Sequence, residues 1–318
     1  MNTLKTSILL IVILFFASCK EAKKDRFTDT LTSGVIPITV DETFEPIIQE
    51  EIDVFEAIYP NAGIVPKFTS ELEAINLLLK DSVRLAITTR PLSSKEEAYL
   101  KSKKFEPHSY KLALDGIALI VNKNNPDTLI TVDQFRQILI GKATKWSDVY
   151  PKSSLGKITL VFDNPNSSTV RYAIDSICGG LPLSDQLSAQ EKNIEVINYV
   201  ARTPSAIGVI GVNWLSNKVD STNLSFNDLV QVMSVSNETV ATEENSYKPY
   251  QAYLFYGYYP LTRNVYIINN DPRTSLPSGF TSFMTSDRGQ RIILKSGLVP
   301  VTQPIRVVNV KNEKLNLK

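Results

Sequence analysis

Cysteine and histidine are scarce in this chain of 318 residues, and their scarcity excludes several kinds of site. Two cysteines, Cys19 and Cys178, and one histidine, His108, are too few for a usual zinc site. His108 lies in a polar stretch, so we expect it at the surface and not as a catalytic base. There is also no G-x-S-x-G motif, so an enzyme such as a phosphatase or a hydrolase is disfavoured. We expect no metal, no cofactor and no catalytic activity.

An excess of charge of one sign is also missing. The chain has 34 Lys and Arg residues against 33 Asp and Glu residues, a formal net charge of +1, and no long charged run. Such a balance does not call for a nucleic-acid partner. Gly141 and Lys142 lack the upstream glycine of a P-loop, which argues against nucleotide hydrolysis by this chain.

Apolar residues near the N-terminus form a run over 8–16 that is too short to span a membrane. The run follows a positive residue, Lys5, and leads through small residues to Cys19, which is typical of a bacterial lipoprotein processing site. The alternative is an ordinary secretory signal peptide, cut after a small-x-small site. We favour the lipoprotein, with residues 1–19 as the signal peptide. Cys19 then carries the lipid and anchors the protein to a membrane of the cell envelope.

The segment after Cys19 is a charged, polar stretch over 20–33, which we interpret as a solvated tether between the membrane and the folded part. If Cys19 carries lipid, Cys178 has no cysteine partner and no disulfide forms. The length of the remaining chain indicates about two domains.

The mature chain alternates β-branched runs with amphipathic segments. The first set predicts strands at 35–40, 64–68 and 83–88, with helices at 44–59 and 70–80 between them. This β-α-β-α-β order implies a mainly parallel sheet covered by helices. A second set predicts strands at 116–122, 158–162, 194–199, 207–212 and 265–268, and helices at 131–140, 169–177 and 280–295. Two α/β lobes fit this pattern better than one large sheet.

Five segments match one known family in consistent order: 115–122 (DGIALIVN), 139–149 (LIGKATKWSDV), 206–211 (AIGVIG), 259–263 (YPLTR) and 286–300, which begins with SDRGQ. Together they resemble the phosphate-binding solute receptors of ABC transporters, which have the type II periplasmic binding protein fold. The resemblance implies two α/β lobes joined by two crossover strands, near Leu114 and Leu261. Lobe 1 would combine 34–113 with 262–318, and lobe 2 would span 114–261. The hinged lobes would close on a ligand in the cleft between them.

The resemblance also implies a function and a set of partners. The protein would be a monomer that captures phosphate or a similar oxyanion and delivers it to ABC permease subunits. A phosphate sensor without transport, or a surface-tethered binding scaffold, is the alternative.

Hydroxyl-bearing residues at helix starts are the candidate ligands for the anion, because helix N-termini offer unpaired N–H donors. Serine and threonine at these places are also ordinary N-caps, so each one alone has a structural explanation. Several such sites at strand ends favour a ligand site, since open α/β sheets bind ligands there. By resemblance, the binding positions are Thr43, Phe44, Ser70, Thr89, Ser167, Ser168 and Thr169.

The sequence departs from the family pattern at three positions. The family's arginine, four residues before its Ser-Gly-Thr, is Asp163 here, and the glycine is Ser168. The family's first-lobe carboxylate is replaced by Thr89. Arg90 or Arg171 would then supply the positive charge, although Arg90 has an alternative as a surface residue. Asp41 or Asp163 would supply the acceptor for the proton of hydrogen phosphate, which sulfate lacks.

Overall fold

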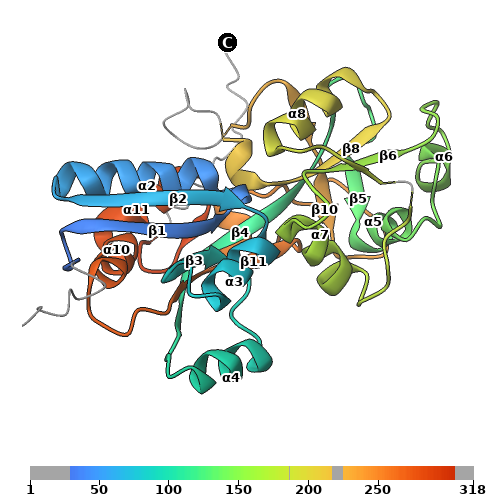
Figure 1. Cartoon of the computed structure of the whole chain (residues 1–318). Coiled ribbons are helices and arrows are strands. Elements are labelled where there is room, and N and C mark those ends of the chain that lie inside the picture. The colour runs from blue at the N-terminus through green and yellow to red at the C-terminus, as the bar shows by residue number, and fades with distance from the viewer. Residues whose placement is uncertain (1–28, 186, 217–224, 305–318) are drawn as a thin grey trace, which may run out of the picture.

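The computed structural model describes residues 29–185, 187–216 and 225–304 (Figure 1). The expected signal peptide, Cys19 and most of the expected tether lie outside these residues. Within the described ranges, no helix is long and apolar enough to cross a membrane.

The first part of the chain forms the predicted β-α-β-α-β unit. Its elements are β1 (Gly34–Asp41), η1 (Glu42–Phe44), α2 (Glu45–Ile58), β2 (Ala62–Thr69), α3 (Glu71–Leu79), β3 (Leu85–Thr88) and α4 (Ser94–Ser102). Strand β1 lies between β2 and β3 and is parallel to both. The carboxyl ends of these strands therefore meet at one edge of the sheet, where the helix starts that follow them also lie.

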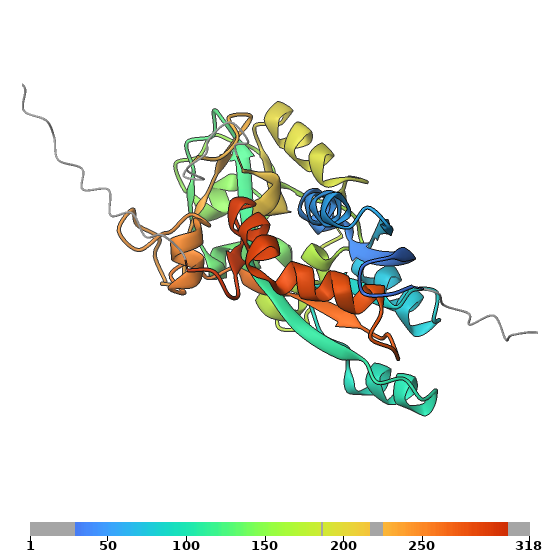
Figure 2. The same cartoon turned by 90° about the vertical axis from the view of Figure 1, so that its left-hand side faces the viewer.

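A long strand, β4 (His108–Asn122), connects the two parts of the molecule (Figures 1 and 2). One end of β4 pairs antiparallel with β11 (Thr262–Asn269), and the other end pairs with β8 (Ala206–Gly211). The resulting strand order is β2-β1-β3-β11-β4-β8-β6-β7. The type II fold expected from the sequence is confirmed, with one correction to the sheets. The sheets of the two lobes are not separate, because β4 pairs with strands of both lobes and links them into one hydrogen-bonded sheet.

The second part contains the remaining elements. They are β5 (Leu129–Thr131), α5 (Val132–Leu139), α6 (Trp146–Val149), β6 (Thr159–Phe162), α7 (Ser168–Tyr172), η2 (Ala173–Ile177), β7 (Ser188–Ala189), α8 (Asn193–Arg202), η3 (Val212–Trp214), β9 (Val230–Val232), β10 (Ser234–Ser236) and α9 (Gln251–Phe255). The chain then returns through β11 to α10 (Leu276–Thr285), α11 (Asp287–Lys295) and β12 (Val299–Pro300).

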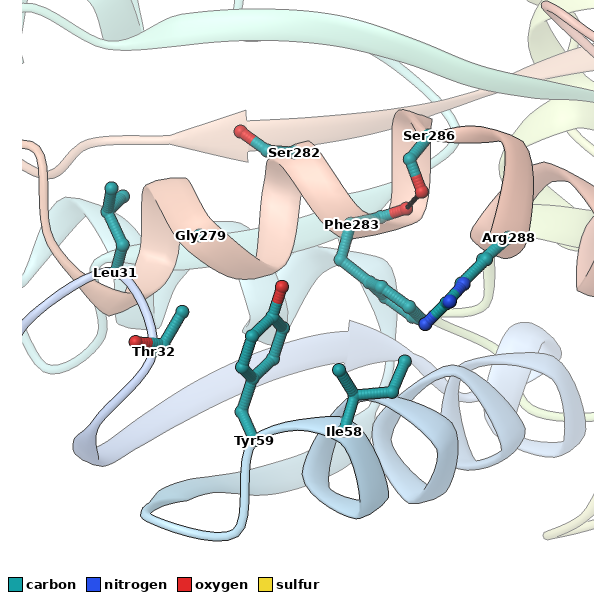
Figure 3. Close-up of a pocket in the computed structure, with 9 residues that line it drawn as sticks. All are labelled: Leu31, Thr32, Ile58, Tyr59, Gly279, Ser282, Phe283, Ser286 and Arg288. Atoms are coloured by element: carbon teal, nitrogen blue, oxygen red, sulfur yellow. Dashed lines mark hydrogen bonds between the residues drawn. The ribbon is translucent and has the colours of Figure 1, made fainter.

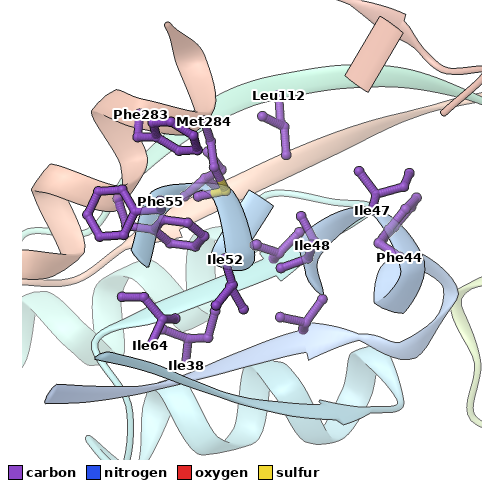
Figure 4. Packing of buried hydrophobic residues seen from close by; sticks show 14 of the residues in the cluster. Ile38, Phe44, Ile47, Ile48, Ile52, Phe55, Ile64, Leu112, Phe283 and Met284 are labelled. Atoms are coloured by element: carbon purple, nitrogen blue, oxygen red, sulfur yellow. The ribbon is translucent and has the colours of Figure 1, made fainter. Parts of the chain in front are cut away.

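Buried apolar side chains form separate cores on either side of the middle of the molecule. We call lobe 1 the part around the core of β1, β2, β3, α2, α10 and α11, which Figure 4 shows from close by. Successive strand residues face opposite sides, so Ile87 joins this core while Ala86 packs under α3 and α4. We call lobe 2 the part around the cores of β6, β8, α5 and α8. The residues at which the chain divides between the lobes, near Leu114 and Leu261, stay a prediction from the sequence.

Two sequence predictions in lobe 2 and the C-terminal region differ from the structure. Residues 194–199, predicted as a strand, lie in α8. Val196, Ile197 and Val200 are spaced as on one face of a helix, and all three are buried against the sheet. The helix predicted at 280–295 is two helices, because Ser286 between them has extended backbone angles.

Close packing of α8 on β8 generates a stability prediction. A Cβ atom at Gly208 would lie 2.7 Å from Ile120 Cγ1 and 2.8 Å from Val200 Cγ2. Gly208→Ala should therefore destabilise the protein by about 1–3 kcal/mol, the usual cost of overpacking a core. Gly156→Ala is the matched control, since nothing lies within 4 Å of its Cβ position. Denaturant unfolding measures both, and equal stability of the two variants would contradict the packing argument.

Candidate functional site

Polar side chains gather between the two lobes, where β1, β3 and β6 end and where β4 and β11 cross. Side chains in such a position are normally apolar or fully paired, because burial of polar groups costs free energy. The buried polar residues of this region are Asp41, Thr43, Glu71, Thr89, Asp115, Asp163, Ser167, Ser168, Thr169, Asn213 and Arg263. We call them the interlobe cluster.

Arg263 holds the centre of the interlobe cluster. Its Nε donates to Asp115 Oδ2 at 2.9 Å, and its Nη1 donates to Ser168 Oγ at 2.8 Å. The guanidinium also lies 5.5 Å from the centre of the Phe44 ring. Arg263 on β11 thus contacts β4, the start of α7 and the end of η1 with one side chain.

Hydroxyl groups from both lobes meet beside Arg263. Thr43 Oγ1 of lobe 1 and Ser168 Oγ of lobe 2 lie 3.4 Å apart, so these residues connect the lobes directly. Thr169 donates to Asp163 Oδ1 at 2.7 Å and lies 2.7 Å from Ser167 Oγ. Ser167 also accepts a bond from the Val170 N–H as the N-cap of α7. The cap and ligand interpretations are therefore compatible at Ser167.

Several buried polar atoms of this cluster have no hydrogen-bond partner among the described residues. They are Asp41 Oδ2, Asp115 Oδ1, Asp163 Oδ2, Asn213 Oδ1 and Arg263 Nη2. Since buried polar atoms are nearly always paired, these atoms are suited to bind a polar guest. The arrangement offers one guanidinium donor, several hydroxyls and several acceptors.

A second group of contacts joins the lobes beside the first. Arg171 of α7 forms an ion pair with Glu71 at the start of α3, and its Nη2 donates to Thr89 Oγ1 at 2.7 Å. Glu71 Oε1 accepts from both the N–H and the hydroxyl of Thr89, each at 2.7 Å. Burial raises the pKa of Glu71, but attraction and hydrogen bonds from Arg171 outweigh burial and lower it overall. Glu71 is thus held ionised as one half of an interlobe latch.

The predicted site residues separate into those that the fold brings together and those that it uses elsewhere. Ser70 is the N-cap of α3 and accepts from the Glu73 N–H at 3.4 Å. Both Arg90 guanidinium NH₂ groups donate to Glu96 of α4 at 2.8 Å. The positive charge of Arg90 is therefore paired with α4 and not with the interlobe cluster. The interlobe cluster contains Asp41, Thr43, Thr89, Asp163, Ser167, Ser168 and Thr169, with the Phe44 ring beside it. Their role as ligands stays a prediction.

Sequence reasoning missed Arg263, Asp115 and Glu71. The segment 259–263 predicts the return crossover, but its resemblance to the family does not mark its arginine as a ligand. Arg263 could have been identified because it is a charged residue inside a strand that passes through the middle of the molecule. A buried charge there requires partners, and Asp115 on the other crossover strand is its salt-bridge partner.

Burial shifts the pKa of other carboxyl groups in and beside the cluster upward. Burial raises the pKa of Asp41 to about 6, even though Arg263 attracts its charge. Burial, with repulsion from Asp163, Asp41 and Glu45, raises the pKa of Glu42 to about 7. Burial also raises the pKa of Asp115 above its usual range.

Two cavities have lining residues in the cluster or next to its residues in sequence. One of about 240 Å³ is lined by Glu71, Arg90, Ser167 and Arg171, and one of about 830 Å³ is lined by Glu42, Glu45 and Trp214 among others. A third cavity, of about 510 Å³, lies on lobe 1 between the ends of α2 and α10 (Figure 3). Its lining includes Tyr59, Phe283 and Arg288 but none of the predicted site residues.

Two lobes that share crossing strands, with a polar cluster between them, define the class of two-lobed solute-binding proteins. A family model described as a PBP superfamily domain matches residues 27–288. The chain belongs to this superfamily.

Relatives with similar sequences carry the name phosphate-binding protein PstS. One from Borreliella burgdorferi is 26% identical over 94% of this chain and 99% of its own length. One from Staphylococcus saprophyticus is 26% identical over 65% of this chain, and the match spans 60% of that relative's length. The family resemblance predicted from the sequence is confirmed.

Solved structures support the same fold. A substrate-binding protein with bound phosphate from Clostridium perfringens matches 84% of this chain and all of its own, with a TM-score of 0.69 and 21% identity. An ABC-type phosphate transport receptor from Vibrio cholerae matches with a TM-score of 0.64 and 21% identity, over the same shares of both chains.

The interlobe latch generates a prediction about closure. Arg171→Met leaves the Glu71 carboxylate without its cation in the closed arrangement, at a cost of roughly 1–3 kcal/mol for an unpaired buried group. The lobes should therefore separate more often, and the radius of gyration in X-ray scattering should increase. Arg136→Met is the control, because Arg136 pairs with Asp133 at the surface of lobe 2. An unchanged radius of gyration in the Arg171 variant would show that the latch does not hold the lobes together.

Proposed function

We propose that this protein is a lipid-anchored solute-binding protein that captures phosphate between its lobes and delivers it to an ABC permease. The observation that supports this most is the set of donors around Arg263. Its unpartnered Nη2 and the hydroxyls of Thr43 and Ser168 come from two lobes and converge in one buried place. Charge-assisted hydrogen bonds from such donors to an oxyanion are worth roughly 1.5–3 kcal/mol each.

The position of the positive charge supports the proposal despite the departure at Asp163. The family's arginine is replaced by Asp163, but Arg263 brings a guanidinium to the same cluster from the returning crossover strand. Arg90 and Arg171 are engaged with Glu96 and Glu71. Arg263 is also paired, with Asp115, but its Nη2 has no partner among the described residues, so it is our candidate for the cation that binds the ligand.

Phosphate fits the acceptors of the cluster better than sulfate. Asp163 and Asp41 each have a buried oxygen without a partner among the described residues. A phosphate hydroxyl donates to such an oxygen, whereas sulfate has no proton and would leave it unpaired. Thr89 replaces the carboxylate that the family has at this position, and in this proposal Asp41 and Asp163 accept the phosphate proton in its place.

Capture and delivery require closure and a location outside the cytoplasm. We assign the hinge to β4 and β11, the strands that cross between the lobes, and we place the protein on the outer face of a membrane through lipid at Cys19. The names of the relatives support phosphate binding, and those of the two solved structures, an ABC transporter substrate-binding protein and a phosphate transport receptor, support the transport role. A sensor without a permease is the alternative, and permease and ATPase genes beside this one would favour transport.

The hydroxyl ligands generate an affinity prediction. Ser168→Ala and Thr169→Ala each remove a hydroxyl from the cluster, so the affinity for phosphate should fall about tenfold or more, equivalent to about 1.4 kcal/mol. Ser93→Ala is the control, since Ser93 is only the N-cap of α4. It should lose about 1 kcal/mol of stability and keep its affinity. Titration calorimetry with a denaturant melt separates the two effects, and unchanged affinity in both cluster variants would remove this loop from the site.

Lipid anchoring generates a separate prediction. Cys19→Ser should leave the protein unprocessed, or soluble and no longer membrane-associated, because the acceptor of the lipid is gone. Cys178→Ser is the matched control, as Cys178 is a buried free cysteine of the folded part. Detergent phase partitioning measures the difference. A Cys19 variant that still enters the detergent phase would refute anchoring through this residue.

A further inference from the structure

Carboxylates outnumber cations in the interlobe cluster. Arg171 is paired with Glu71, and Arg263 is paired with Asp115. Asp41 and Asp163 are fully buried, and no salt bridge among the described residues includes either of them. A guest that brings two negative charges into this place would add repulsion where burial weakens the screening by water.

The buried atoms without hydrogen-bond partners show the same excess of acceptors over donors. Asp41 Oδ2 and Asp163 Oδ2 are acceptors without a partner among the described residues, and Arg263 Nη2 is the guanidinium donor of the same cluster without one. A guest that satisfies all three atoms must donate at least as many hydrogen bonds to carboxylates as it accepts from the guanidinium. Among phosphate ions, only the form with two hydroxyl groups donates to both aspartates at once.

We propose that the site takes up phosphate as the singly charged dihydrogen ion, with its two hydroxyl groups donating to Asp41 and Asp163. This inference rests on the proposed function and adds the protonation state of the ligand. The remaining oxygens of the ion accept from Arg263 Nη2 and from the hydroxyls of Thr43 and Ser168. The dihydrogen ion brings one negative charge fewer than hydrogen phosphate to a place where Arg263 is already paired with Asp115.

Charged groups from several elements face the two aspartates. Arg263 attracts the charge of Asp41 from β11, while Glu71 repels it from α3. Glu42 is repelled by both Asp41 and Asp163, and its pKa is raised to about 7 by burial and these neighbours. Among the described residues that face the pair, Arg171 is paired with Glu71, and Arg263 is paired with Asp115 but keeps its Nη2 without a hydrogen-bond partner.

Affinity as a function of pH tests the inference. If the complex holds one proton more than the free protein and hydrogen phosphate, the affinity must fall as the pH rises. The expected loss is about tenfold per pH unit above the second pKa of phosphate. Calorimetry between about pH 6 and about pH 8 measures it. An affinity that stays level or rises over this range would overturn the inference, while no phosphate binding at any pH would refute the proposed function itself.

Two amide variants test the named residues. In Asp163→Asn and Asp41→Asn, the side-chain NH₂ can donate, so an oxyanion no longer needs a proton at that position. Each variant should have a weaker pH dependence, and Asp163→Asn should bind sulfate about tenfold or more tighter than the unmodified protein does. Asp133→Asn is the control, because Asp133 is exposed and forms its ion pair with Arg136 at the surface.

Two results of this comparison would overturn the inference. One is an unchanged pH dependence in both variants, and the other is a failure of Asp163→Asn to gain sulfate binding. A denaturant melt of each variant verifies that it is folded. Asn at position 41 can still accept from the Thr43 N–H, so the bond that Asp41 Oδ1 makes there is kept.

Discussion

The buried ion pair between Arg263 and Asp115 is the interaction on which the middle of this protein depends. The two residues are direct cross-strand partners on β11 and β4, the strands that pass between the lobes. Their side chains are 3% and 0% exposed, so removing either one leaves a buried charge unpaired, at a cost of about 3–5 kcal/mol. The same guanidinium reaches Ser168 of lobe 2. One side chain therefore fixes the crossover and supplies the cation of the candidate site.

The location of this cation has consequences for how the lobes work together. In the proposed closure, a guanidinium on the crossover strand would stay near the centre, and the hydroxyls of Thr43 and Ser168 would come to it from different lobes. A ligand bound to Arg263 would then satisfy donors from both lobes only in the closed arrangement. The latch of Arg171 and Glu71 adds a direct contact between the lobes beside this centre. Ligand binding and closure would then be coupled, because the proposal uses the same few residues for both.

The fold could be predicted because local patterns and the global arrangement agree. The alternation of strands and helices in 34–88 follows from periodicity alone, and the order of five segments identified the family. The strand predicted at 194–199 was wrong because β-branched residues with helical spacing suit both structures locally, and only packing against β8 decides between them. Arg90 could not be assigned from sequence, since Glu96 lies six residues away and competes for it. Arg263 was missed because its partner is distant in sequence, and contacts between crossing strands have no local pattern.

The central claim is that an oxyanion binds between the lobes on Arg263 and the hydroxyls of Thr43 and Ser168. The most direct test is a crystal structure of the protein grown with phosphate. The account predicts a tetrahedral ion within hydrogen-bond distance of Arg263 Nη2, both hydroxyls and Asp163 Oδ2. A phosphate ion bound elsewhere, for example in the cavity lined by Tyr59 and Arg288, with the interlobe cluster unchanged, would contradict it.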